Sequence, residues 1–225
     1  MVRAGKPLIV AIDGPSGVGK STVSRRVAHA LNLPHIDTGA MYRALGLAAL
    51  REEVDTHDEP ALEALANRLK IDFVPGERAR VLLGGEDVTS MIRTPEVSMA
   101  ASDVSTVPAV RRTLVKLQQE LGRRNGGVLE GRDIGTKVFP ETPYKFFLTG
   151  RPEVRARRRY EELLAKGGSP DFQTVLSETI ARDKQDSTRA DSPLTYDDTY
   201  TLVDTSDLTI DQVVAAIVER VQTLC

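Results

Sequence analysis

The feature that most constrains this chain is a glycine-rich segment at residues 14–21, which fits the pattern G-x-x-x-x-G-K-[ST]. An apolar run at 8–12 precedes it and predicts a buried parallel strand. Residues 22–31 follow it, with apolar side chains spaced along one face of a helix. A glycine turn that merely caps a helix is the alternative, but a strand, this loop and a helix in succession favour a phosphate-binding loop (P-loop). The chain is therefore predicted to bind a nucleoside triphosphate.

Each residue type in this segment has a chemical reason. The glycines let successive backbone N–H groups point into one concavity, and the following helix adds its positive end. Lys20 is expected near the β and γ phosphates, and the Ser21 hydroxyl is the candidate ligand of Mg²⁺, with the carboxylate partner left open between Asp13 and Asp133. The candidate phosphate-binding residues are Gly14, Pro15, Ser16, Gly17, Val18, Gly19, Lys20, Ser21 and Thr22.

Composition narrows the class of protein. The 225 residues are 40% hydrophobic and 28% charged with a net charge of −2, which is typical of a globular protein and argues against a general nucleic-acid binder. The single cysteine, Cys225, excludes a disulfide framework and suits a reducing compartment. His29, His35 and His57 have no ligand spacing and are interpreted as structural or surface residues.

No apolar run is long enough to span a membrane, and the residues before the first expected strand are too few for a signal peptide. We therefore expect a cytoplasmic protein with no membrane or nucleic-acid partner. No long apolar heptad suggests a partner helix, so a monomer is the default expectation.

Strand-like runs at 8–12, 35–37, 127–130, 145–149 and 201–204 alternate with helical patterns. This alternation predicts an α/β fold with a parallel sheet covered by helices on both faces. Ligands of such folds bind beyond the carboxyl ends of the strands. Polar or glycine-rich residues follow four of the runs, at 13, 37–39, 131–133 and 149–150, so a site is expected at this edge.

Two stretches interrupt the alternation. Residues 60–105 predict a small inserted α+β subdomain, with a helix at 60–69, strands at 71–74, 79–83 and 87–88, and turns at 75–76 and 84–85. From Pro152 to Pro193 we expect two helices, of which the first ends at 167–170 and the second is capped by Asp171. Glycines and prolines flank this stretch and would let the two helices move as a lid. An amphipathic helix at 210–224 is expected to close the chain.

Several kinds of P-loop protein are disfavoured because their signatures are missing. The chain has no Asn-Lys-x-Asp guanine reader, no strand ending in Asp-Glu and no Ser-Gly-Gly-Gln segment, which leaves transfer to a small acceptor. Two phosphate-bearing molecules that meet end to end need many cations, and Arg suits this role. Arg155, Arg158 and Arg159 share one helix face, which indicates either an anion site or a solvated surface balanced by neighbouring glutamates.

Several motifs in order resemble the bacterial cytidylate kinase family: residues 14–20, 37–43, 92–97, 100–102, 131–136 and 182–183, with Arg189 and the insert near 71–88. The resemblance spans nearly the whole chain. It implies a single domain over 1–225 with a P-loop NMP-kinase-like core, in which a five-stranded parallel sheet is flanked by helices. It further implies an inserted NMP-binding subdomain at about 60–105 and a helical lid at about 151–190.

The resemblance implies phosphoryl transfer from ATP to CMP or dCMP with Mg²⁺. The catalytic residues would be Lys20 with Arg155, Arg158 and Arg159 of the lid. Two departures stand out, because Ser21 replaces a common Gly and Thr38 replaces the usual Ser but keeps its hydroxyl. The residues implied to hold the acceptor nucleotide are Thr38, Arg43, Ser102, Arg111, Arg132, Asp133, Arg182, Asp186 and Arg189.

The chemistry of cytosine suits this assignment. Asp133 would accept from the N4 amino group, and Arg111 and Ser102 would serve the acceptor edge. Asp186 would accept from a sugar hydroxyl, while Arg43, Arg132 and Arg189 would neutralise the acceptor phosphate. The structural alternatives are a helix-surface salt bridge for Arg43, an ion pair of Arg132 with Asp133, and a solvated loop for Asp186 and Arg189. Two other functions stay open: another small-acceptor kinase, and a nucleotide-gated binding module without acceptor.

Overall fold

The computed structural model describes residues 7–74, 80–189 and 191–224. The expected turn at Pro75-Gly76, the first six residues and Cys225 lie outside the described residues. Within the described part, no helix is long and apolar enough to cross a membrane.

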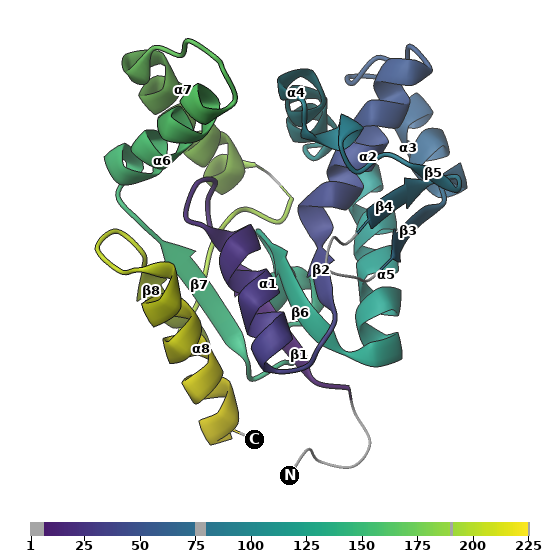
Figure 1. The fold of residues 1–225 in the computed structure, drawn as a ribbon. Coiled ribbons are helices and arrows are strands. Elements are labelled where there is room, and N and C mark those ends of the chain that lie inside the picture. Colours follow the sequence, from purple (N-terminus) through teal and green to yellow (C-terminus); the bar gives the residue numbers. More distant parts are fainter. Residues whose placement is uncertain (1–6, 75–79, 190, 225) are drawn as a thin grey trace.

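The centre of the molecule is a parallel sheet of five strands in the order β2-β6-β1-β7-β8 (Figure 1). The strands are β1 (Ile9–Asp13), β2 (His35–Asp37), β6 (Gly127–Gly131), β7 (Lys145–Thr149) and β8 (Thr201–Asp204). All five expected strands are confirmed, with bounds that shift by one residue at most. Asp13 pairs with Gly131 and Asp37 with Glu130, so the carboxyl ends of these strands meet at one edge.

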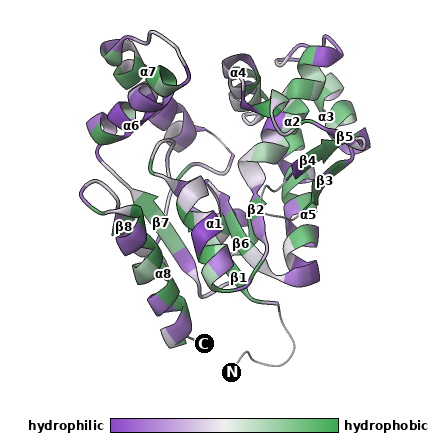
Figure 2. Cartoon of the chain, in the orientation of Figure 1, coloured by the Kyte–Doolittle hydropathy of each residue, from purple (hydrophilic) through white to green (hydrophobic). Residues whose placement is uncertain are grey.

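Helices cover both faces of this sheet, as the alternation predicted. Side chains along a strand point to opposite faces in turn. Val10, Ile12 and Val128 pack with α1 (Lys20–Ala30) and α8 (Ile210–Leu224), whereas Ala11, Ile36 and Leu129 pack with α2 (Thr38–Arg51) and α5 (Pro108–Asn125). In Figure 2 most of β7 is green, whereas α1 and α8 carry both green and purple stretches, in agreement with amphipathic helices packed on an apolar sheet face.

The segment between α2 and α5 adds a second, smaller sheet. It contains α3 (Glu59–Arg68), the antiparallel strands β3 (Ile71–Val74), β4 (Arg80–Leu83) and β5 (Glu86–Asp87), the short helix η1 (Met91–Arg93) and α4 (Pro95–Val104). Asp58 and Thr94 cap α3 and α4 by accepting from backbone N–H groups. Helix α4 packs closely on α2, since a Cβ on Gly46 would come within 2.9 Å of the Ala101 nitrogen. The expected strand at 87–88 is observed one residue earlier.

Helices α6 (Pro152–Ala165) and α7 (Phe172–Thr188) form the other projection above the sheet (Figure 1). Pro152 lies in the first turn of α6, and Asp171 caps α7 by accepting from Thr174 N at 2.8 Å, as expected. The two helices are joined by an edge-on contact of Tyr160 with Phe172, whose rings lie 5.8 Å apart.

Candidate active site

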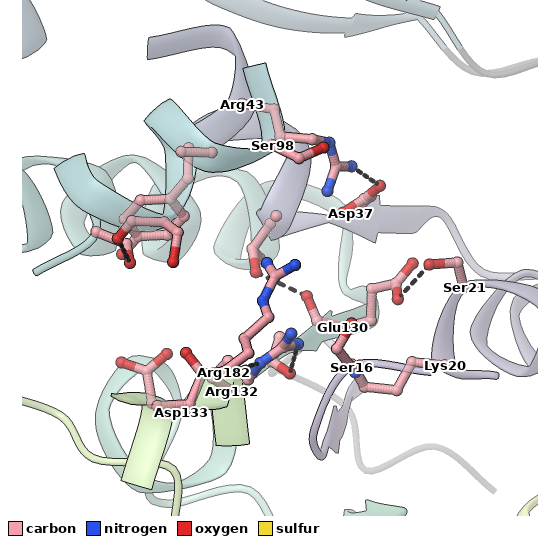
Figure 3. A pocket seen from close by; sticks show the side chains of 18 of the residues that line it. Ser16, Lys20, Ser21, Asp37, Arg43, Ser98, Glu130, Arg132, Asp133 and Arg182 are labelled. Atoms are coloured by element: carbon pink, nitrogen blue, oxygen red, sulfur yellow. Dashed lines mark hydrogen bonds and ion pairs between the residues drawn. The ribbon is translucent and has the colours of Figure 1, made fainter. Parts of the chain in front are cut away.

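A cavity of about 340 Å³ opens at the carboxyl edge of the sheet. Its lining comes from the P-loop, the start of α2, α4, α5, the turn after β6, and α7. It is thus bounded by the sheet edge and by both projections, and Figure 3 shows charged side chains converging on it from these elements.

The P-loop has the backbone that its glycines were expected to permit. Gly14 has φ +148°, and a Cβ there would lie 2.2 Å from the Leu148 carbonyl oxygen of β7. Gly19, with φ +88°, is the N-cap of α1, a left-handed conformation that glycine adopts without strain. The loop therefore depends on glycine at these positions.

Lys20 is buried at the floor of the cavity, where its Nζ donates to the Pro15 carbonyl at 2.6 Å. Burial lowers the pKa of Lys20, and the nearby charge of Arg132 lowers it further. An anion bound in the cavity would oppose both effects and favour the charged amine.

The structure divides the predicted phosphate-binding residues into two groups. Gly14, Pro15 and Val18 lie behind the cavity surface; Gly14 is pressed against β7 and Val18 is part of the core. The residues that line the cavity are Ser16, Gly17, Gly19, Lys20, Ser21 and Thr22.

All of the residues predicted to hold the acceptor line the same cavity, although they come from five separate segments. They are Thr38, Arg43, Ser102, Arg111, Arg132, Asp133, Arg182, Asp186 and Arg189. Sequence analysis gave no role to five further lining residues: Tyr42 and Ala101, which lie within the motifs at 37–43 and 100–102, and Ser98, Ser105 and Glu130, which lie outside the motifs.

Asp133 and Arg111 form a buried ion pair on the wall opposite the P-loop. The Arg111 side chain is 2% exposed, donates to the Ser105 carbonyl at 3.1 Å, and lies 5.6 Å over the Tyr42 ring. Sequence analysis had considered an ion pair of Arg132 with Asp133. In the structure, Arg132 instead pairs with Asp186. The Arg111–Asp133 pair places a donor group beside an acceptor group in the cavity lining.

Cations crowd around Asp186, which lies on α7 and is buried, so it is not part of a solvated loop. Its Oδ2 accepts from Arg132 Nε at 2.8 Å, and Arg189 lies 3.9 Å from its other oxygen. Burial acts to raise the pKa of Asp186, but attraction to Arg132, with Arg182 and Arg189, outweighs burial and leaves the pKa below its ordinary value. One carboxylate thus faces three arginines.

Two of these arginines keep buried nitrogens without a partner among the described residues, Nε of Arg182 and one terminal nitrogen of Arg189. Burial, followed by repulsion from Arg132, lowers the pKa of Arg182. Unpaired buried donors are costly, and the crowding of like charges adds to that cost. Both costs are relieved when an anion binds between the guanidinium groups.

The start of α2 brings a further charged pair to the cavity. Arg43 donates to Asp37 at 2.7 Å, and Asp37 also caps α2 by accepting from Ala40 N at 3.0 Å. The salt bridge considered for Arg43 is therefore present, although it faces the cavity. Across the cavity, Ser102 of α4 donates to Gln185 of α7 at 3.3 Å.

The arginines predicted to be catalytic on α6 lie outside the cavity lining. Arg155 is buried and bonded to both oxygens of Asp183, to the Gly150 carbonyl at 2.8 Å and to the Ser16 carbonyl at 3.0 Å. Arg158 donates to the carbonyl and hydroxyl oxygens of Thr205.

Arg159 is exposed and pairs with Glu162 at 3.1 Å. This contact fits the alternative that sequence analysis had considered for α6, a solvated helix surface on which glutamates balance the charges of the arginines. The charge of Arg159 nevertheless helps to lower the pKa of Arg182, which lines the cavity.

The two candidates for the carboxylate beside Ser21 are both engaged elsewhere. Asp13 accepts from Ile134 N and Gly135 N at 2.9 Å and from the Tyr200 hydroxyl at 2.8 Å. Burial raises the pKa of Asp13 to about 6, although these hydrogen bonds oppose the rise. Asp133 is held by Arg111.

The carboxylate that does contact Ser21 is Glu130, whose Oε2 accepts from the Ser21 hydroxyl at 2.8 Å (Figure 3). Sequence analysis placed Glu130 inside a strand and gave it no role. The available signal was a charged residue at the carboxyl end of an otherwise apolar run, which is costly to bury without partners.

A P-loop at one side of a cavity and arginines with unpartnered buried nitrogens at the other fit two anionic reactants that meet between them. The fold and the site therefore define a P-loop kinase that acts on a small acceptor. The sequence comparisons specify the family: the chain belongs to the cytidylate kinase family, whose sequence model, described as cytidylate kinase, matches residues 10–223.

Relatives agree with this placement. The chain is 48% identical over 217 residues to the cytidylate kinase of Syntrophotalea carbinolica, covering 96% of this chain and 92% of the relative. It is 48% identical over 213 residues to that of Desulforamulus reducens, covering 95% and 96%. Among solved structures, an uncharacterized protein from Eubacterium ventriosum has a TM-score of 0.55 at 15% identity, covering 97% of this chain and 99% of that one, which shows a shared fold.

Proposed function

We propose that this kinase transfers a phosphoryl group from ATP to CMP and dCMP, giving ADP with CDP or dCDP, as a step of pyrimidine nucleotide metabolism. The observation that carries the proposal is the buried Arg111–Asp133 pair, which faces the P-loop across one cavity. The relatives named cytidylate kinase support the same acceptor. Residues 60–105 act as the acceptor-binding subdomain, and 151–190 act as the lid.

The acceptor base is selected by hydrogen bonding. Asp133 accepts from the N4 amino group of cytosine, while Arg111 and Ser102 serve its acceptor edge. Uracil has a carbonyl at position 4, so its lone pairs would face the Asp133 carboxylate. A buried site of this kind rejects the wrong base because its polar groups are left unpaired.

The acceptor phosphate lies among Arg43, Arg132, Arg182 and Arg189. Their positive charges reduce the repulsion between this phosphate and the triphosphate of the donor. Asp186 accepts from a sugar hydroxyl through the oxygen that Arg132 does not occupy. The attacking phosphate oxygen is already anionic, so no general base is needed. Catalysis then consists of positioning and charge stabilisation by Lys20 and the arginines.

The lid arginines act in different ways in this proposal. Arg155 and Arg158 hold α6 against the P-loop and the Thr205 loop through the contacts described above. Arg159 is the one that reaches the transferred phosphoryl group, because its surface pair with Glu162 is weak and exposed. Closure of α6 and α7 excludes water and suppresses ATP hydrolysis.

The oxygen atoms of Ser21 and Glu130 fit a hard cation such as Mg²⁺, which binds through one or two protein ligands together with water and substrate phosphates. No group of three His, Cys, Asp or Glu side chains that would form an all-protein cage occurs in the described part of the chain. When bound, Mg²⁺ neutralises charge on the β and γ phosphates. Ser21 and Glu130 would hold it next to the P-loop.

A coupled ADP-release assay with AMP, GMP, UMP, CMP and dCMP tests the reaction. We expect CMP and dCMP to be preferred, and Asp133→Asn to lower the preference for CMP over UMP by about tenfold or more, because it removes the acceptor for N4. Asp72→Asn, an exposed aspartate of β3, is the matched control.

Two results would contradict the proposal. Equal rates with AMP, GMP and CMP would point to a different small-acceptor kinase, and ATP binding without ADP release on addition of CMP would indicate a binding module.

A further inference from the structure

The carboxylate of Glu130 is held at both oxygens, and one of its partners lies outside the cavity. Oε2 accepts from Ser21, whereas Oε1 lies 2.9 Å from Nε2 of His35. The backbone carbonyl of Glu130 accepts from the Thr38 hydroxyl at 2.7 Å. The Glu130 side chain is only 4% exposed and that of His35 only 13% exposed, so the contact between these two side chains is largely shielded from water.

The sheet register explains how His35 reaches this carboxylate. Strand β2 lies beside β6, with His35 opposite Val128 and Asp37 opposite Glu130. Paired residues of parallel strands point to the same face, and alternate residues share a face. His35 and Glu130 therefore both lie on the face that α1 covers, and Ser21 is the second residue of α1.

The donor in this contact follows from chemistry. An ionised carboxylate only accepts, so Nε2 of His35 carries the hydrogen and donates to Oε1. With Oε1 occupied in this way, the side chain of Glu130 is fixed in the orientation that turns Oε2 towards Ser21. A free glutamate has three rotatable bonds, and its ordering would otherwise oppose metal binding.

His35 does not line the cavity, whereas Ser21 and Glu130 do. It therefore acts on any ligand only through Glu130. We propose that His35 is a positioning residue that orients Glu130 for the divalent cation of the donor nucleotide. This inference rests on the proposed role of Ser21 and Glu130 in holding that cation.

Partners of a metal-binding carboxylate contribute to metal affinity without touching the metal. Their removal typically weakens metal binding by about tenfold to a hundredfold. The test is therefore a direct measurement of Mn²⁺ affinity, by electron paramagnetic resonance, for the full-length protein saturated with ADP. Mn²⁺ replaces Mg²⁺ in the titration because it is paramagnetic.

We expect His35→Leu to weaken Mn²⁺ binding by about tenfold. His35→Gln should restore it to within about twofold, because the glutamine amide nitrogen can occupy the position of Nε2 and donate to Oε1. His29→Leu, an exposed histidine of α1, is the matched control and should leave the affinity unchanged. ADP affinity measured with EDTA should be the same in all variants, which also verifies their folding.

Glu130→Gln separates this inference from the function on which it rests. If Glu130→Gln weakens Mn²⁺ binding but His35→Leu does not, the metal site stands and the positioning role of His35 is wrong. If neither variant changes the affinity, the metal site itself is wrong, and the inference fails with it. A glutamine at 35 that fails to restore binding, or a loss of ADP affinity in EDTA that matches the loss of Mn²⁺ affinity, also overturns the role of the N–H donor.

Discussion

The arginines of the cavity and the arginines of helix α6 differ in how fully their guanidinium groups are already bonded. Arg182 and Arg189 keep buried nitrogens without a partner among the described residues, whereas Arg155 is bonded to two carbonyls and to both oxygens of Asp183. The same residue type thus prepares an anion site in one region and joins structural elements in the other. The two groups of arginines differ in whether their buried nitrogens already have hydrogen-bond partners.

The largest effect is expected from Arg182→Ala, which removes a guanidinium group whose buried Nε has no hydrogen-bond partner among the described residues. We expect kcat/KM for CMP to fall by about a hundredfold to a thousandfold, as when other pre-oriented charges are removed from active sites. Steady-state kinetics measure it, with Arg112→Ala, an exposed arginine of α5, as the control. A loss below about tenfold would place Arg182 with the structural arginines.

The next effect concerns stability, because Arg155 is already bonded to structural groups. Arg155→Met leaves Asp183 without its partner, and the free energy of unfolding should fall by about 2–3 kcal/mol, less than for a fully buried pair because Asp183 is partly exposed. Urea denaturation measures it. The double variant Arg155→Met/Asp183→Leu should recover part of the loss.

One outcome would show that Arg155 is not a structural arginine. If Arg155→Met folds with unchanged stability but loses activity as strongly as Arg182→Ala, then Arg155 contacts the reactants directly.

Arg159 lies on α6 like the structural arginines but is proposed to contact the phosphates like the cavity arginines. Its replacement should have the smallest effect of the three on stability and activity. Its pair with Glu162 is exposed, so its removal should change stability by less than about 0.5 kcal/mol. We expect Arg159→Ala to lower kcat by about tenfold, because the guanidinium group meets the phosphates only when the lid closes. Glu162→Gln, which frees Arg159, should preserve kcat. An unchanged kcat in Arg159→Ala would assign it to the helix surface.

Much of the fold could be predicted because the sequence pattern of each element agrees with the place that the element takes in the structure. Strands β1, β6 and β7 are mainly apolar and buried runs followed by polar or glycine-rich residues, and Asp171 caps the helix that follows it, as expected. The small differences lie at strand ends, such as β5, where two residues carry little periodic signal.

The site was less predictable, since its decisive contacts join residues far apart in the chain. Nothing near Arg155 in the sequence indicates that Asp183 will occupy its donors, so helical spacing left only an anion site or a solvated surface as alternatives and did not reveal a buried structural pair. Glu130 was overlooked because it is part of a strand, and the hydroxyl that justifies its burial, Ser21, lies on a different element. Motif residues identified the cavity, but bonding partners decide what each does there.

One feature of the sheet edge affects how readily the cavity can change. The backbone of the turn after β6 is anchored at Ile134 and Gly135 by Asp13, which belongs to the neighbouring strand β1 and does not line the cavity. The backbone of that turn therefore has an anchor separate from the side chains at 132 and 133, whose partners are Asp186 and Arg111. An exchange of either side chain together with its charged partner can retune what the pocket accepts while the backbone beneath stays anchored.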